Sequence, residues 1–484
     1  MRKNKQIVFL LMFCSFVTLK IFSKTIEVSS QEEFIKAQSN AVAKDIILWL
    51  PGTYKDIYLN IYKDNITVKT KFLGKTIFTG ASKALIRGNG IIFKGFQYIN
   101  GNIGSDNVIS LGGSHINMSE INISHYISYK YLYVKANCQY NQIYKCNFEK
   151  RINIADKNIL SIRVSDKQPG FHKIQYCSFR NFEGTGQDMG VEPIRIGTSS
   201  RSKFDSKTIV EYCYFTECNG DGELISNKAG KNILRYNTFE NNPLGELVLR
   251  HGSNTYVYGN FFLKGKGGIR IKEGSNHYIF NNYFSELSGR SISVYGEKIN
   301  PIRNVYIMNN TFVNTSKLHL GGNKTVLPKK LVLANNFFVY PNTTSVGNAS
   351  GKEQWIGNMF EGKLGITINK GFKKITPYLS KNEFGFYELT SKSSAVNGSK
   401  KCKVKLPIFK GLDVDSKLNY DIVKNKRPDV FSQKDVGCVE FSVKGNVLKP
   451  FATSENTGPS YETAIKEEVE IKQELKIDQE IEKQ

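Results

Sequence analysis

A short apolar segment that ends in a turn residue and a phenylalanine recurs along the middle of the chain. The phenylalanines are residues 148, 179, 215, 239, 262, 284, 312, 338 and 360, and two positions before each stands a Cys or an Asn. The spacings are 31, 36, 24, 23, 22, 28, 26 and 22 residues. A period in the low twenties with longer exceptions predicts a solenoid with loops inserted at some coils.

The residues within each repeat alternate in the manner of a strand, as in NILRYNTF, TYVYGNFF and HYIFNNYF. They are rich in β-branched and aromatic side chains, and helical periodicity is nearly absent. We therefore expect an all-β fold, a right-handed parallel β-helix with an irregular C-terminal cap. Equivalent Asn, Cys and Phe residues should stack in ladders from coil to coil. A leucine-rich repeat shares the period, but its Leu consensus is missing.

The repeat also bears on the cysteines. Cys146, Cys177 and Cys213 occupy the Asn position of their coils, which favours stacked buried thiols over disulfides. Cys402 and Cys438 lie outside the repeats and could pair, and the sequence leaves that open.

The ends of the chain differ from the repeats. A basic start, an apolar run over residues 7–19 and a polar exit predict a signal peptide at 1–24, too short to span a bilayer. We expect a β-helical catalytic domain at 25–394, a Lys-rich closing segment at 395–461 and a charged tail at 462–484. The protein should be secreted or periplasmic, monomeric and without stable membrane insertion.

The net charge of the chain indicates which classes of partner it could bind. The 484 residues include 67 Lys or Arg and 43 Asp or Glu, a net charge of +24. Such a surplus suits a polyanion: nucleic acid, an acidic polysaccharide or an anionic membrane. The basic residues are spread along the chain without a basic arm or zinc-finger spacing, so we expect no nucleic-acid partner.

Candidate chemistry lies in NGDGELISNKAG, residues 219–230. Asp221 and Glu223 would project from the same face of a strand and repel each other unless a proton or a cation lies between them. Their oxygen atoms suit Ca²⁺. Lys228 follows closely enough to share the site. A solvent-facing charged patch on the wall of the solenoid is the alternative.

The repeat predicts which residues join this segment. Arg250 and His251 follow Lys228 by 22 and 23 residues, so Arg250 should lie about one coil spacing, roughly 5 Å, away. Arg270 comes one period later, and Glu192 and Arg195 one coil earlier. The acidic pair, the lysine and the arginines should thus share one face across four coils.

Calcium, a lysine and an arginine on a basic face suit one reaction of a uronate polymer. The cation would neutralise the uronate carboxylate, the lysine would take the proton on carbon 5, and the arginine would assist departure of the oxygen on carbon 4. The product of this β-elimination is an unsaturated uronate.

These residues resemble polysaccharide lyase family 6, which includes alginate lyases and chondroitinase B. The resemblance covers most of the chain after the signal peptide, through EPIRIGTSS, GDGELISNKAGKNILRYNTF, GELVLRHGSN, YGNFF, GGIRI and HYIFNNYF in order. Later segments, DVDSKLNYDIVKNKRPDVF, DVGCVEF and TGPSY, resemble the closing region of that family.

The resemblance implies that Lys228 is the general base and Arg250 the catalytic acid. It implies that Asp221 and Glu223 bind Ca²⁺ and that Glu192 completes the shell. Asp221 stands where Glu is usual, and Ala229 follows the base where Ser is common. The candidate substrate-binding residues are His251, Arg270, Arg195, His277 and Arg290.

The substrate remains open between two classes. Alginate (poly-mannuronate) is the expected polysaccharide, and chondroitin or dermatan sulfate is the alternative, because the same chemistry serves both. A non-catalytic β-helix that binds polysaccharide is a further alternative. A hydrolase would use paired catalytic Asp residues, which the Lys and Arg alignment disfavours. The sequence does not decide between endo and exo cleavage.

Overall fold

The computed structural model describes residues 23–152, 158–296, 302–367, 370–412, 417–443 and 447–462. Most of the predicted signal peptide at 1–24 and nearly all of the predicted tail at 462–484 lie outside these residues. No helix in the described ranges is long and apolar enough to cross a membrane.

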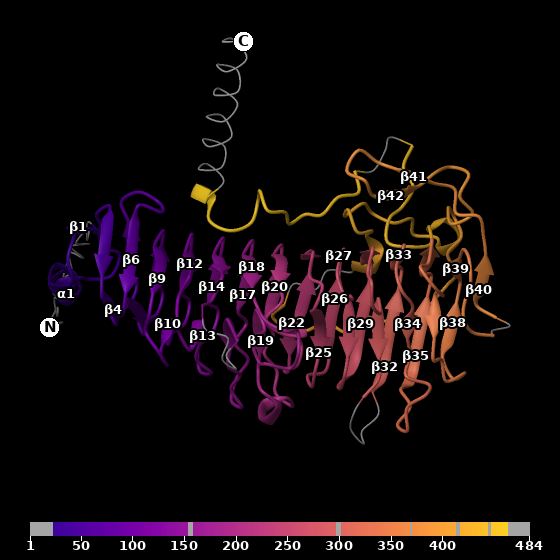
Figure 1. The fold of residues 1–484 in the computed structure, drawn as a ribbon, viewed down its shortest axis with the longest axis horizontal. Coiled ribbons are helices and arrows are strands. Elements are labelled where there is room, and N and C mark those ends of the chain that lie inside the picture. Colours follow the sequence, from indigo (N-terminus) through magenta and orange to yellow (C-terminus); the bar gives the residue numbers. More distant parts are fainter. Residues whose placement is uncertain are drawn as a thin grey trace, which may run out of the picture.

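Three long parallel sheets form the body of the molecule, which is elongated (Figure 1). Each coil passes through sheet 1, sheet 2 and sheet 3 in turn, and each strand pairs with its counterpart in the next coil. The predicted all-β parallel β-helix is therefore confirmed.

Sheet 1 has 14 strands: β1 (Thr25–Val28), β2 (Ile46–Trp49), β5 (Thr67–Thr70), β8 (Ile92–Lys94), β11 (Asn117–Ser119), β14 (Gln142–Tyr144), β17 (Lys173–Gln175), β20 (Ile209–Glu211), β23 (Ile233–Arg235), β26 (Thr255–Tyr258), β29 (Ser275–Phe280), β32 (Arg303–Met308), β35 (Lys329–Ala334) and β38 (Gln354–Ile356).

Sheet 2 also has 14 strands: β3 (Gly52–Lys55), β6 (Thr76–Gly80), β9 (Gln97–Gly101), β12 (Asn122–Ser124), β15 (Asn147–Glu149), β18 (Ser178–Phe182), β21 (Tyr214–Cys218), β24 (Thr238–Glu240), β27 (Phe261–Leu263), β30 (Tyr283–Ser285), β33 (Thr311–Val313), β36 (Phe337–Val339), β39 (Asn358–Phe360) and β40 (Phe372–Lys374).

Sheet 3 has 12 strands: β4 (Tyr58–Ile61), β7 (Lys83–Ile86), β10 (Asn107–Leu111), β13 (Lys130–Val134), β16 (Leu160–Ile162), β19 (Ile194–Ile196), β22 (Glu223–Asn227), β25 (Glu246–Leu249), β28 (Ile269–Ile271), β31 (Ile292–Val294), β34 (Leu318–His319) and β37 (Val346–Gly347).

The ladders expected from the repeat are present between sheets 1 and 2. Buried asparagines pass a side-chain hydrogen bond from coil to coil, from Asn237 to Asn260 at 3.1 Å and on to Asn358. The phenylalanine rings from Phe148 to Phe338 stack at centroid distances of 4.7–5.1 Å. These ladders fix the register of the coils and so place the residues of sheet 3.

The cysteines behave as the repeat predicts. Cys146, Cys177 and Cys213 are buried and free, in line with the asparagines. Cys402 and Cys438 are also free, which answers the open question of their pairing.

The N-terminal end of the β-helix is capped, whereas the C-terminal segment packs on the outer face of sheet 2, where Phe386 lies 5.5 Å from Tyr283. The helix α1 (Gln31–Asn40), which the repeat analysis did not predict, caps the first coil, and Phe34 packs on Trp49 at 6.0 Å. In the C-terminal segment, β41 (Leu379–Lys381) and β42 (Tyr387–Leu389) form an antiparallel pair. Short 3₁₀ turns occur at Ser199–Arg201, Lys417–Asn419 and Phe431–Gln433.

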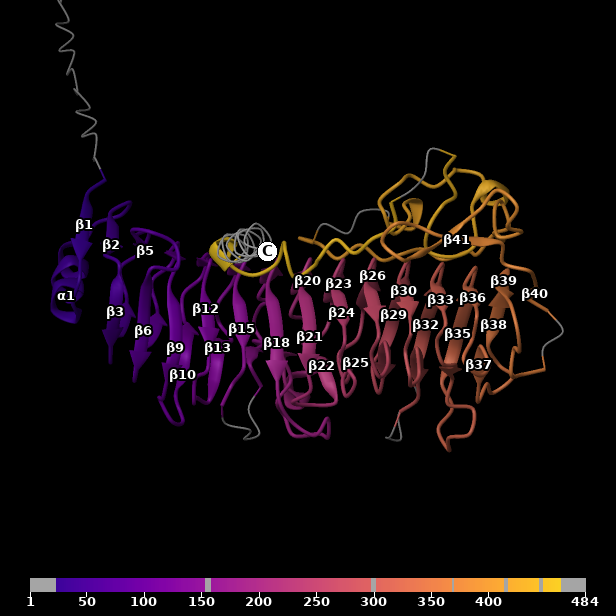
Figure 2. The same ribbon diagram turned by 45° about the horizontal axis from the view of Figure 1, so that its top comes forward.

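The last described residues run back along the body as an extended strap, residues 447–462 (Figure 2). Phe451 packs on Tyr236 at 5.4 Å, and the Ser460 backbone N–H donates to Glu120 at 2.6 Å. The strap lies against sheets 1 and 2, so it leaves the outer face of sheet 3 uncovered.

Candidate active site

Sheet 3 carries the predicted site on its outer face, midway along the body (Figure 1). The register places Arg195 of β19 beside Ser226 of β22, then Val248 of β25 and Arg270 of β28. The residues on either side of these, such as Ile225, point inward and are fully buried. Strand alternation therefore sends this row outward.

Lys228 and Arg250 occupy successive rungs just after this row. The Lys228 N–H donates to Ile196 O at 2.8 Å, and the Arg250 N–H donates to Asn227 O at 2.8 Å. The coil between them is 22 residues long, because Asn227 pairs with Leu249. The predicted stacking of the lysine on the arginine is confirmed.

Lys228 is partly buried, and its ammonium makes no hydrogen bond or ion pair with other residues in the described part of the chain. Burial lowers the pKa of Lys228, and the nearby guanidinium of Arg195 lowers it further. The carboxylates of Glu192 and Glu223 offset part of this effect. A lysine with a lowered pKa has a larger neutral fraction, which is the form that accepts a proton.

Arg250 is held by two carboxylates. Its Nη1 donates to Glu223 Oε1, and its Nη2 donates to Asp188 Oδ2 at 3.1 Å. Burial alone would lower the pKa of Arg250, but Glu223 and Asp188 outweigh burial and raise it. Arg250 therefore stays charged and has a fixed orientation.

Asp221 is fully buried in the loop before β22. Its Oδ2 accepts the backbone N–H groups of Gly190 and Val191 at 2.6 and 3.2 Å, and its Oδ1 accepts that of Glu223 at 2.9 Å. Burial raises the pKa of Asp221 to about 7, and repulsion from the carboxylates of Glu192 and Glu223 contributes. The three acidic side chains thus form one crowded group.

Two features of this group fit a bound cation. The Oε2 atom of Glu223 is buried and accepts no hydrogen bond from the described residues. The repulsion on Asp221 is the kind that a cation relieves. Against this, no set of three or more His, Cys, Asp or Glu side chains within the described ranges is arranged to hold a metal. Glu223 Oε2 is the free oxygen of the group, Asp221 would add an oxygen that already accepts backbone N–H groups, and Glu192 is paired with Arg195.

Glu192 forms a double hydrogen bond with Arg195. Arg195 Nε donates to Oε1 at 3.0 Å and Nη2 to Oε2 at 2.5 Å. Glu192 is 1% exposed, so this pair is largely shielded from water. The same arginine also lowers the pKa of Lys228, which links Glu192 to the candidate base.

Arg270 lies on the same face but not on the same row as Arg250. It pairs in register with Val248, and its Nε lies 3.3 Å from Glu246 Oε2. The residue that follows Arg250 on the next rung is Lys272, whose N–H donates to Leu249 O. Arg270 therefore shares the face, as predicted, but it lies two residues before the position that stacks on Arg250, because this coil has 22 residues.

The three remaining predicted binding residues differ in position. His251 lies at the edge of the site, with Nδ1 2.8 Å from Glu273 Oε2 and Nε2 2.9 Å from Ser199 Oγ. Arg290 is exposed and donates to the Tyr295 hydroxyl at 2.8 Å. His277 on β29 is fully buried, and burial lowers its pKa to about 4. A side chain without exposed surface has no access to substrate, so we leave His277 out of the proposed site.

Sequence reasoning missed the carboxylates that hold Arg250, Arg270 and His251. Glu246 pairs with Glu223 in the strand register, so the period could have revealed it. Asp188 and Glu273 come from loops, whose position no repeat specifies. Burial raises the pKa of Glu246, and Arg270 counters that effect.

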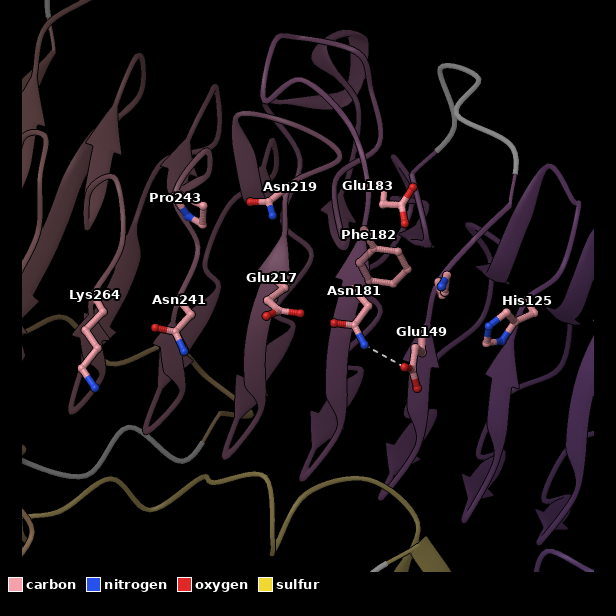
Figure 3. A pocket seen from close by; sticks show the side chains of 11 residues that line it. His125, Glu149, Asn181, Phe182, Glu183, Glu217, Asn219, Asn241, Pro243 and Lys264 are labelled. Atoms are coloured by element: carbon pink, nitrogen blue, oxygen red, sulfur yellow. Dashed lines mark hydrogen bonds between the residues drawn. The ribbon is translucent and has the colours of Figure 1, made fainter.

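A hollow of about 690 Å³ lies on the neighbouring corner of the helix, along the bends that end sheet 2. Figure 3 shows side chains from successive coils in a row: His125, Glu149, Asn181, Glu217, Asn241 and Lys264. Its acidic residues are Glu149, Glu183 and Glu217. A mixed lining that contains neither Lys228 nor Arg250 suits an acidic polymer poorly, so the face of sheet 3 is the candidate site.

Comparison with known proteins agrees with this fold. A family model described as chondroitinase B matches residues 28–356. The PL6 family alginate lyase AlyGC is 26% identical, with a TM-score of 0.68, and the match covers 76% of this chain and 55% of AlyGC. The chain thus spans about half the length of that relative.

Two further structures share the fold. A mannuronic acid specific polysaccharide family 6 lyase from human gut microbiota is 21% identical, with a TM-score of 0.63 over 73% of this chain and 91% of that one. The PL6 polysaccharide lyase Pedsa3628 from Pseudopedobacter saltans is 21% identical, with a TM-score of 0.59 over 72% and 97%. No curated protein matches the chain. Because the family model covers well over half of its length, the chain belongs to the chondroitinase B family, polysaccharide lyase family 6.

Proposed function

We propose that this protein cleaves a uronate-containing polysaccharide by β-elimination on the outer face of sheet 3. The observation that carries the proposal is the pair on successive rungs: Lys228 with a lowered pKa, and Arg250 held in its charged form. Family membership supports the reaction class.

Lys228 acts as the base. Its neutral amine takes the proton from carbon 5 of the uronate and becomes an ammonium ion. The electron pair of that C–H bond forms the double bond between carbons 4 and 5, and the bond from carbon 4 to the glycosidic oxygen breaks. Burial and the charge of Arg195 keep Lys228 available for this step.

Arg250 stabilises the charge that develops during elimination. Since Glu223 and Asp188 raise its pKa, Arg250 is a weaker proton donor than the expected catalytic acid. We assign it hydrogen-bond donation to the departing oxygen, and water supplies the proton that completes the new hydroxyl group.

We propose Ca²⁺ as the cofactor at Asp221 and Glu223, with Glu192 added if its pair with Arg195 opens. The orphaned Oε2 of Glu223 and the raised pKa of Asp221 support this. A bound calcium would neutralise the carboxylate of the substrate and so favour loss of the neighbouring proton. Arg195 and Arg250 already supply positive charge at this position.

We propose alginate as the substrate. AlyGC, the relative at 26% identity, is an alginate lyase, and the gut relative is specific for mannuronic acid. Dermatan or chondroitin sulfate is the second candidate, because the matching family model is named for chondroitinase B. The signal-like N-terminal sequence leads us to propose that the protein is secreted or periplasmic.

The decisive experiment measures ultraviolet absorbance of the unsaturated product with alginate and dermatan sulfate side by side, with and without a chelator. We expect absorbance to rise with alginate and to fall on chelation. If absorbance rises with dermatan sulfate and not with alginate, dermatan sulfate replaces alginate as the proposed substrate. If folded protein gives no rise in absorbance with either polymer, the proposal that it is a lyase is overturned, and a polysaccharide-binding protein is favoured.

A further inference from the structure

We infer that the N-terminal half of sheet 3 is a second binding surface for the polysaccharide, a basic track made by Arg87, Lys135 and Arg163. It would hold the polymer on one side of the cleaved bond, far from the reacting residues. This inference rests on the proposed function, because it takes an acidic polysaccharide as the occupant.

Backbone hydrogen bonds place the track in line with the active site. One residue per coil, directly after the sheet 3 strand, donates its backbone N–H to a carbonyl oxygen of the preceding coil. In chain order these residues are Arg87, Gly112, Lys135, Arg163, Gly197, Lys228, Arg250 and Lys272. Every one of them occupies the same position in its coil. The candidate base and the three track residues therefore share one row along the helix axis.

The track residues are free to meet a ligand. Arg87, Lys135 and Arg163 are all exposed. Arg87 Nε donates to Asn60 Oδ1 at 3.1 Å, and none of the three forms an ion pair with a carboxylate among the described residues. Gly112 and Gly197 carry no side chain, so the floor between the cations is open.

The two outward rows that make up the track contain no carboxylate. The adjacent outward row, traced by strand register, is Asn60, Leu85, Ser110, Tyr133, Ser161, Arg195, Ser226, Val248 and Arg270. Neither this row nor the track row contains an Asp or Glu from residue 60 to residue 272. Tyr133 is partly exposed and offers a ring on which a sugar can stack.

The spacing suits a polymer that carries repeated negative charge. Paired strands lie about 4.8 Å apart, so Arg87, five rungs from Lys228, is roughly 24 Å from the reacting centre. A sugar chain laid along the axis presents a carboxylate at intervals of similar length. Each exposed cation contributes modestly, and together they raise affinity for long chains only.

The test compares two triple variants with the same change in charge. Arg87→Ala, Lys135→Ala and Arg163→Ala remove the track. Lys69→Ala, Lys94→Ala and Lys173→Ala remove three cations from the outer face of sheet 1 and serve as the control. The substrates are alginate and an alginate trisaccharide, which spans too few rungs to reach Lys135 or Arg87.

We expect removal of the track to lower the ratio of kcat/KM for polymer to that for trisaccharide by about tenfold, through KM, at low salt. The control should leave this ratio unchanged. An unchanged ratio in the track variant, or an equal fall in the control, would overturn the inference.

A separate measurement keeps the inference distinct from the proposed function. Affinity electrophoresis in an alginate gel reports binding without turnover. If the wild type cleaves no polymer, the lyase proposal fails. In that case, the basic track is still supported if the alginate gel retards the control variant more than the track variant. Equal retardation of the two variants would contradict the track.

Discussion

The chemistry of Lys228 depends on the charge of Arg195. Arg195→Ala removes the cation that lowers the pKa of Lys228 and also frees the negative charge of Glu192, and both changes raise that pKa. The base is active only when neutral, so the limb on which kcat/KM rises with pH should move to higher pH. Arg195→Lys keeps the charge and should move it less. A limb that stays in place in Arg195→Ala would show that Lys228 is not the base.

Removal of the base itself gives a larger effect. Lys228→Met keeps the length of the side chain without the amine and should lower kcat by roughly 10²–10⁴-fold, while retardation in an alginate gel persists. Lys272→Met, two rungs further along the row, is the matched control and should retain most of the turnover. Equal losses in the two variants would mean that the row binds substrate without a specific base.

The acidic group predicts a calcium effect that does not depend on turnover. Calcium should raise the Tm of the wild type, because it binds only the folded site, and should not raise that of Glu223→Gln. Since burial raises the pKa of Asp221 to about 7, binding has to displace a proton. The gain in Tm should therefore be larger at about pH 8 than at about pH 6. A gain of equal size in Glu223→Gln would place the ion elsewhere.

At the level of single residues, the sequence predicted what the repeat controls. The 22-residue spacing of Lys228 and Arg250 is visible in the sequence, and the structure places the two residues on successive rungs. The partners of Arg250 and His251 could not, because Asp188 and Glu273 belong to loops that occur once. Arg270 lies one row away, because it follows Arg250 by 20 residues whereas the coil has 22.

At the level of elements, the asparagine ladder holds adjacent coils in register. Asn282 is fully buried, donates to Asn310 Oδ1 at 3.0 Å and accepts from the side chain of Asn260 at 3.0 Å. Asn282→Ala leaves the buried backbone N–H of Asn260 without its acceptor and removes the amide donor to Val257 O and Phe280 O. We expect it to lower the free energy of unfolding by about 2–4 kcal/mol, measured by urea denaturation.

The exposed Asn342 provides a comparison for the ladder. Asn342→Ala should change the free energy of unfolding by less than about 0.5 kcal/mol. A loss in Asn282→Ala no larger than that of this control would mean that backbone pairing alone sets the register.

Elements that repeat were predictable, and elements that occur once were not. The same alternation of side chains, followed by the same type of turn residue, recurs in nine repeats, so the strand pattern could be predicted from the sequence. The capping helix α1 is a single short segment with Ser30 at its N-cap, and its place is set by the contact of Phe34 with Trp49. Such contacts are tertiary and leave no period in the sequence.

At the scale of the whole molecule, the strap joins coils that are distant in sequence. Ser460 bonds Glu120 across 340 residues, and Arg180 pairs with Glu462. In a solenoid each coil otherwise contacts only its neighbours, so stability is a sum of local terms. The strap adds a long-range tie along the N-terminal half, on sheets that do not carry the active site.

Tyr461 anchors this tie against the second sheet. Its ring lies so close to Gly74 that a Cβ at Gly74 would come within 2.5 Å of Cδ2. Tyr461→Ala should cost about 2 kcal/mol through lost apolar burial, and the loss should be local. We expect faster amide exchange in the coils around residues 74–180 and no change in β25 or β28, with kcat preserved. Tyr340→Ala, on an exposed ring, is the control. Coils that depend only on their neighbours cannot transmit the loss of one contact to the far end of the β-helix. Amide exchange that accelerates equally along the whole β-helix would therefore show that the strap stabilises the fold globally.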